Sequence, residues 1–276
     1  MENLPSQIRG PKLSRFKGDL ADAQFVKLLS SGDDQDSDGT PHSRVFLVTI
    51  KDKRYTVKIF SFVALDDIRP FVPTKEHLID DIVVREQIDP FFAECRAFGL
   101  LVKDGKDHEL AVRCYGYAIL SEEVERRIGE EFGIRDWNRS MEHHKEPLRA
   151  IVKDYIRYLS FDKPKRHAKM RENLVELNKM GIYNMDIRKE NYLGGRLFDF
   201  STAMTAPHLS FWIELRDLWQ IKEDMDYDRW CFDFMIETAN AEKSKNDVMN
   251  RNRWKNLRSR SVKKTPRKRW TTRKGR

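Results

Sequence analysis

The 276-residue sequence lacks the features of a membrane or secreted protein. Its longest apolar runs, such as VFLVTI and FGLLV, are far shorter than the ~20 residues that a membrane helix needs, so no membrane partner is expected. The N-terminus has no apolar core of a signal peptide. Only three cysteines occur, Cys95, Cys114 and Cys231, and they form no CxxC pair. We interpret them as small buried hydrophobic residues in a reducing compartment.

The end of the chain lacks acidic side chains. Residues 251–276 carry thirteen Lys or Arg and no acid, whereas the other 250 residues carry a net charge of −5. Because like charges repel one another, we expect a disordered basic tail over residues 246–276 that binds a polyanion. Trp254 and Trp270 lie among these charges and favour non-specific nucleic-acid binding through residues 251–276. A nuclear localisation signal and a merely solubilising tail are the alternatives, and the first of these places the protein in the nucleus.

The rest of the chain has the pattern of a mixed α+β protein. Segments rich in Val, Ile, Phe and Tyr predict five strands, at residues 23–29, 43–50, 54–60, 109–120 and 148–156. Residues 89–102 predict a helix with Asp89 as its cap and Pro90 in its first turn. Residues 163–181 predict another helix, and its last residue, Gly181, is a helix stop.

Between Ser201 and the basic tail, the chain has room for two short helices. We expect them at residues 211–225 and 226–242. Trp212, Trp219 and Trp230 fall at helical positions there, and we expect their side chains in the core.

The segment GIYNMDIRKENYLGGRLFDFS, residues 181–201, places polar residues around a tight turn. Asn191 follows Asp186 by five residues, and Asp199 follows a turn at Gly194 and Gly195. A short hairpin at this turn would return Asn191 and Asp199 to one end of a sheet. Because Mg²⁺ prefers carboxylate and amide oxygens, a magnesium-phosphate site is one interpretation. The other is that these Asp and Asn side chains only cap turns.

This segment resembles the catalytic and metal loops of protein kinases, in which an Asp precedes an Asn by five residues and Asp-Phe-Gly follows. The resemblance implies that Asp186 is the catalytic residue that orients an acceptor hydroxyl, while Asn191 and Asp199 hold Mg²⁺. It also implies that Lys58, in YTVKIF, binds the phosphates of ATP and pairs with Glu94. A solvated strand lysine and a solvated helix glutamate are the alternatives for these two residues.

The sequence also departs from the kinase pattern. The glycine-rich loop is missing, because Gly32 and Gly39 are separated by an acidic insertion. Asn184 and Met185 stand where His and Arg precede the catalytic Asp, and Ser201 stands in place of the Gly. Since only about 50 residues separate Ser201 from the basic tail, the C-terminal lobe must be small.

Several stretches are similar to a fungal family of kinase-like proteins named for the kinetochore Sim4 complex subunit. They are FFAECRAFGLL, AVRCYGYAIL, FGIRDWNR, LRAIVKDYI and DIRKENYLGGRLFDFSTAMTAPH, all within residues 22–240. The resemblance implies protein partners at the kinetochore and a nuclear location at the centromere.

We therefore expect an α+β protein with a reduced bilobal protein-kinase-like fold, a small C-lobe and a disordered basic tail. Its expected parts are an N-terminal extension (residues 1–21), N-lobe-like strands with one helix and a hinge (22–157), a reduced helical C-lobe (158–245) and the tail (246–276). Two functions stay open. One is a divergent phosphotransferase with ATP and Mg²⁺ as cofactors, favoured by the intact set of five polar residues. The other is a non-catalytic pseudokinase scaffold tethered to kinetochore chromatin, favoured by the missing glycine loop and the small C-lobe.

Overall fold

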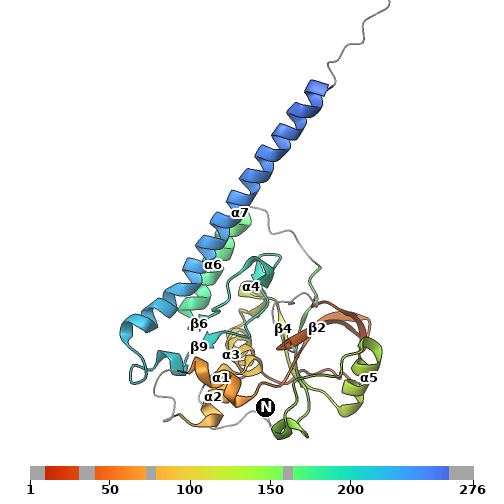
Figure 1. Cartoon of the computed structure of the whole chain (residues 1–276). Helices are drawn as coiled ribbons and strands as arrows, with labels where there is room; N and C mark the ends of the chain where they lie inside the picture. Colours follow the sequence, from red (N-terminus) through yellow and green to blue (C-terminus); the bar gives the residue numbers. More distant parts are fainter. Residues whose placement is uncertain (1–9, 31–40, 73–78, 158–163, 261–276) are drawn as a thin grey trace, which may run out of the picture. The chain divides into compact units, whose positions relative to one another are not determined.

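The computed structural model describes residues 10–30, 41–72, 79–157 and 164–260 (Figure 1). The chain divides into two compact units, residues 1–232 and 233–276. The first unit contains a five-stranded antiparallel sheet with the strand order β1-β2-β3-β5-β4. Its strands are β1 Gln24–Leu28, β2 Ser43–Ile50, β3 Lys53–Phe60, β4 Cys114–Ile119 and β5 Arg149–Asp154. The mixed α+β class and all five strands that the sequence predicts are confirmed.

One face of the sheet carries the larger hydrophobic core. Alternate side chains of a strand point to opposite faces, which places Val57 and Ile59 of β3 in this core. Helix α5 (Glu122–Phe132) supplies Val124 and Ile128 to the same core. The sequence does not predict α5 as a helix. Most of the residues of this segment are charged, so its two buried apolar positions, four residues apart, give only a weak helical pattern.

The other face of the sheet packs against α3 (Pro90–Lys103), as the alternation of β3 requires. Phe60 of β3 meets Phe91 of α3 edge to face, with ring centroids 5.5 Å apart. The helix begins as predicted, because the Asp89 side chain accepts a hydrogen bond from the Phe91 N–H at 2.8 Å. Most of α3 is buried, so even its polar residues face protein.

Shorter helices surround α3. They are α1 Leu65–Ile68, η1 Arg69–Phe71, α2 Asp81–Ile88 and α4 Asp107–Leu110. Ile68, Val84 and Leu209 belong to a second apolar cluster that ties α1 and α2 to the segment after the LGGRL turn. The sequence predicts only a loop around Pro70, since helices of one or two turns give too little periodicity to detect.

The segment after β5 positions the polar motif. Helix α6 (Pro164–Lys179) ends just before Gly181, which has a φ of 82°, as the sequence predicts. The predicted hairpin is confirmed, since β7 (Tyr192–Leu193) pairs with β8 (Arg196–Leu197) across the turn at Gly194 and Gly195. The remaining short elements are η3 Met141–His143, β6 Ile182–Tyr183, η4 Lys189–Asn191, β9 Met204–Thr205 and η5 Leu209–Phe211.

The C-terminal part of the described chain is one helix, α7 (Leu218–Arg260). The prediction of two helices is therefore wrong, and α7 also covers residues 246–260 of the predicted tail. No Gly or Pro interrupts the sequence from residue 218 to 260, and Lys and Arg are good helix formers. Residues 261–276 of the predicted tail lie outside the described residues, as does the acidic insertion at residues 31–40.

The prediction that three tryptophans at or near the start of α7 lie in the core is wrong. Trp212, Trp219 and Trp230 are 41%, 63% and 63% exposed, so they do not form the core. Ile221 and Phe232 face inward instead. No helix of the described chain is long and apolar enough to cross a membrane.

Candidate functional site

Four charged side chains meet beneath the sheet, on the face that packs against α3. Lys58 of β3 donates to Glu94 of α3 (Nζ–Oε2 2.9 Å) and to Asp199 (Nζ–Oδ1 2.7 Å). Lys153 of β5 donates to the other oxygen of Glu94 (Nζ–Oε1 2.6 Å). We name Lys58, Glu94, Lys153 and Asp199 the charge cluster. The two alternative interpretations, a solvated Lys58 and a solvated Glu94, are wrong because these side chains are 2% and 0% exposed.

Lys153 is a member of this site that the sequence prediction misses. Its Nζ also donates to the backbone carbonyl of Phe198 at 2.7 Å, immediately before Asp199. The sequence feature that could have identified Lys153 is the similarity of IVKD in β5 to TVKI in β3. Ile151 pairs with Lys58 across the two strands, and Lys153 lies two residues further on the same face. Only the strand pairing shows that both lysines reach one glutamate.

The charges stabilise one another in a setting where each alone would be costly. Burial lowers the pKa of Lys58, but the carboxylates of Asp199 and Glu94 outweigh it, and the pKa is raised. Burial likewise raises the pKa of Asp199, but the ammonium groups of Lys58 and Lys153 hold it well below its usual range. Two cations therefore lie against two acidic groups, and the lowered pKa keeps Asp199 ionised at neutral pH.

Asp199 is fixed by the residues that follow it. The Ser201 N–H donates to Asp199 Oδ1 at 2.9 Å. The Phe200 ring is fully buried and packs edge to face on Phe98 of α3 at 5.1 Å. The Asp-Phe pair of the sequence motif thus has a mechanical role, because the phenyl ring anchors the carboxylate against the helix that carries Glu94.

Asp186 and Asn191 form a second, more open group beside the charge cluster. Asn191 Nδ2 donates to Asp186 Oδ2 at 2.8 Å and to the Asp186 carbonyl at 2.9 Å. The Asp186 side chain is 34% exposed and also meets Arg188 at 3.2 Å. Since the amide nitrogen of Asn191 is used by Asp186, the amide oxygen points the other way. The structure thus brings the five predicted residues into two groups, Lys58–Glu94–Asp199 and Asp186–Asn191.

Asn184 links these two groups. Its Nδ2 donates to the Asp199 carbonyl at 2.6 Å, and its Oδ1 accepts from the Asp186 N–H at 3.2 Å. Asn184 stands where the kinase pattern has His, and it performs this linking role without a titratable group. A change at Asn184 would therefore disturb Asp186 and Asp199 together.

Asp228 of α7 holds the loop from beneath and is a second residue that the sequence prediction misses. It is fully buried, and its carboxylate accepts from the N–H groups of Asn184 (2.7 Å) and Met185 (2.8 Å). Met185 has a φ of 64°, a conformation that non-glycine residues seldom adopt, and these bonds help to hold it there. Burial raises the pKa of Asp228, and the hydrogen bonds oppose that effect. The signal was the helical spacing of Ile221, Asp228 and Phe232 on one face of α7.

The donor types of the site fit Mg²⁺, which takes oxygen ligands from Asp and Asn. The Asn191 amide oxygen faces away from Asp186, and the contacts described for Asp199 converge on Oδ1. Among the described residues, no group of three or more His, Cys, Asp or Glu side chains is arranged to hold a metal ion. Any ion here would therefore take most of its ligands from water and a phosphate.

A cavity of about 390 Å³ opens next to this site. Ser201 and Thr202 line it just after Asp199, and Pro90 and Ala93 line it at the start of α3. Its size lies in the range of small-molecule sites, and half of its remaining lining residues are apolar. The site therefore borders a space that could admit a small group.

Comparison with known families gives a match over most of the chain. The family model described as "Kinetochore Sim4 complex subunit FTA2" matches residues 2–204, nearly three quarters of the chain. The matched range includes the charge cluster, Asp186 and Asn191, and it ends before Asp228. Among curated proteins, none matches the chain.

Proposed function

The chain belongs to the family of the kinetochore Sim4 complex subunit FTA2, and we propose that it is a protein-binding subunit of a kinetochore complex, located in the nucleus at the centromere. We propose that it is built on a reduced protein-kinase-like fold. The order of a five-stranded sheet, α3, a polar loop and an Asp-Phe pair supports this proposal, as does the contact between Lys58 and Glu94.

The observation that carries the scaffold function is the completeness of the charge cluster. Each ammonium group already lies within 2.9 Å of a carboxylate, and the cluster has no net charge. A nucleotide phosphate would have to compete with Asp199 and Glu94 for Lys58, in a region where exchanging partners is costly. The cluster therefore joins β3, β5 and α3 to the Asp199 segment without a ligand, which suits a rigid binding module.

The test is the location of the tagged full-length protein in a fungal cell and the set of proteins that co-purify with it. We expect a focus that coincides with a centromere marker and co-purification with Sim4 complex subunits. A control with the same tag on an unrelated protein of similar charge excludes attraction by the basic segment alone. A diffuse signal together with no co-purification would overturn the subunit function.

A second function, Mg-ATP binding with phosphate transfer, is favoured by the Asp186–Asn191 pair. In it, Lys58 and Glu94 position the phosphates, Asp186 accepts the proton of an acceptor hydroxyl, and Asn191 and Asp199 hold Mg²⁺. The hydrogen bond between Asn191 and Asp186 fixes the two side chains relative to each other, and Asp186 is the more exposed of the two.

Thermal unfolding with ATP and Mg²⁺ tests this second function. Ligand binding to the native state raises the melting temperature, and Asp199→Asn should abolish the rise if Asp199 holds the metal. Asp22→Asn, a change at an exposed aspartate, is the matched control and should keep the rise. No rise in the wild type, or an equal rise in the Asp199→Asn protein, would exclude the nucleotide site.

We propose that residues 251–276 add a salt-sensitive contact with nucleic acid. The support is the charge of this segment, thirteen Lys or Arg without an acid. Deleting it should abolish duplex DNA binding at low salt, since the remaining chain is acidic. Unchanged DNA binding by the truncated chain would assign that binding to the folded domain.

A further inference from the structure

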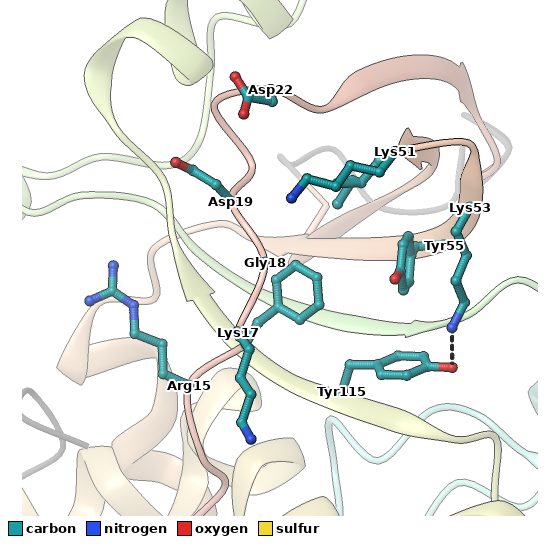
Figure 2. Close-up of a pocket in the computed structure, with 11 residues that line it drawn as sticks. Arg15, Lys17, Gly18, Asp19, Asp22, Lys51, Lys53, Tyr55 and Tyr115 are labelled. Carbon is teal, nitrogen blue, oxygen red and sulfur yellow. Dashed lines mark hydrogen bonds between the residues drawn. The ribbon is translucent and has the colours of Figure 1, made fainter.

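A cavity of about 860 Å³ lies at the edge of the sheet, at the start of β3 (Figure 2). We name it the sheet-edge cavity; Arg15, Phe16, Lys17, Gly18, Asp19, Asp22, Ile50, Lys51, Lys53, Tyr55 and Tyr115 line it. Lys53 and Lys58 are both on β3, five residues and about 16 Å apart along the strand. The cavity is therefore separate from the charge cluster.

The floor of the cavity is aromatic and preformed. Tyr55 contacts Phe16 and Tyr115 edge to face, with ring centroids 5.8 Å and 5.3 Å apart. Phe16 is held in place because its N–H donates to the Tyr117 carbonyl of β4 at 2.7 Å. Gly116 makes this approach possible, since a Cβ there would lie 2.5 Å from the Ser14 carbonyl oxygen. These backbone contacts fix the floor before any ligand arrives.

The rim of the cavity is mainly cationic. Arg15, Lys17 and Lys51 are exposed, and none of them makes an ion pair within the described part of the chain. Lys53 instead donates to the Tyr115 hydroxyl at 2.7 Å and lies 4.3 Å from the centre of that ring (Figure 2). A carboxylate placed beside Arg15, Lys17 or Lys51 would gain a partner that the described part of the protein does not supply.

The conformation of the turn that contains Lys51 supports a role for the Lys51 side chain in ligand binding at the cavity. Lys51 and Asp52 form the two-residue connection between β2 and β3, with φ values of 46° and 64°. Asn-Gly is the favoured pair for such a turn, because side chains are strained at positive φ. The chain has a lysine at this position despite the strain, beside a cavity that already contains other cations.

The charge distribution selects a peptide rather than a nucleic acid. Asp19 and Asp22 lie in the upper part of the view, where Lys51 also lies, and apart from Lys17 and Lys53 (Figure 2). These two carboxylates would repel a continuous phosphate backbone passing through the cavity. A peptide can place an apolar side chain on the rings and carboxylates only at the cationic part of the rim. The volume suits a few side chains.

We propose that the sheet-edge cavity binds an acidic peptide segment of a partner protein, with an aromatic or aliphatic anchor on Phe16, Tyr55 and Tyr115. This proposal rests on the protein-binding function proposed above and names the surface and the chemistry of the partner. Recognition uses the rings for affinity and the cations for orientation, as in other interfaces with aromatic centres and polar rims.

Fluorescence anisotropy with the purified full-length protein tests the proposal. The probe is a fluorescein-labelled peptide, Glu-Glu-Phe-Leu-Glu-Glu, and Lys-Lys-Phe-Leu-Lys-Lys and a single-stranded oligonucleotide are the comparison probes. The double variant Lys17→Glu with Lys51→Glu should weaken binding of the acidic peptide roughly tenfold, because two exposed attractive contacts are replaced by repulsive ones. Lys27→Glu, at an exposed lysine of β1 outside the cavity, should leave it unchanged.

The basic segment 251–276 also attracts acidic peptides, so the result is read from variants that all keep this segment. Equal weakening by Lys27→Glu and by the cavity variant, or tighter binding of the oligonucleotide or the basic peptide at the cavity, would overturn the proposal. Peptide binding is measured without cells, so its loss does not depend on centromere localisation. A protein that localises but does not bind the peptide would refute the cavity alone.

Discussion

The charge cluster and the sheet-edge cavity use the same kind of residue at two ends of one strand. Lys58 is buried and lies within 2.9 Å of both Glu94 and Asp199. Lys53 is exposed and rests on aromatic rings, with a hydroxyl as its hydrogen-bond partner. The difference shows how burial decides the role of a lysine. Inside, its charge must be matched by carboxylates and joins parts of the fold, whereas at the edge it is available to a ligand.

The largest expected effect is at the shared carboxylate of the cluster. Glu94→Gln leaves Lys58 and Lys153 with one anion between them in a buried site, so we expect a loss of about 3–5 kcal/mol of unfolding free energy. Urea denaturation measures it. Glu123→Gln removes a carboxylate from an exposed ion pair with Arg126 and serves as the control, with little change expected. Comparable losses in the two variants would contradict the difference between buried and exposed charge.

A smaller effect concerns His208, a buried group that is held neutral. Its Nε2 lies 3.1 Å from the Gln87 carbonyl, and its Nδ1 accepts from the Ser210 N–H at 3.2 Å. Burial lowers the pKa of His208 to about 4, from an ordinary value of 6.5. As the pH falls from 6.5 to 4, His208 binds a proton in the unfolded chain but stays neutral in the folded chain. Stability therefore falls by up to roughly 3 kcal/mol in this window.

The acid dependence is measured by urea denaturation at several pH values. His208→Gln should flatten the slope between pH 4 and 6.5, whereas His144→Gln, at an exposed histidine, should leave it unchanged. An unaltered slope in the His208→Gln protein would show that other groups cause the acid sensitivity.

The smallest expected effect is at the sheet edge. Lys53→Ala removes an exposed ammonium group and its contact with Tyr115, and we expect a change of less than about 1 kcal/mol in unfolding free energy. A loss as large as that of Glu94→Gln would mean that Lys53 stabilises the fold in the same way as Lys58.

The strands and the motif order could be predicted from the sequence because they depend on local patterns. Alternating Val, Ile and Phe marked β2 and β3, and the spacing of Asp186, Asn191 and Asp199 marked the loop and hairpin. These features involve residues that are close in sequence.

The missed residues depend on contacts between distant segments. Lys153 belongs to the site only because β5 lies beside β3. Asp228 belongs to it only because the folded chain brings α7 to Met185, which lies 43 residues earlier in the sequence. The exposed Trp219 and Trp230 show the same limit, since a helical pattern does not reveal which face of a helix is buried.

We propose that this chain works by binding proteins and does not need phosphate transfer. Replacing the cellular copy by Asp186→Ala tests it most directly, because Asp186 is partly exposed and its removal leaves the charge cluster in place. We predict the same protein level, centromere signal and chromosome segregation as in the wild type. Loss of segregation by the Asp186→Ala protein at a normal level and normal melting temperature would contradict the claim and favour the enzyme.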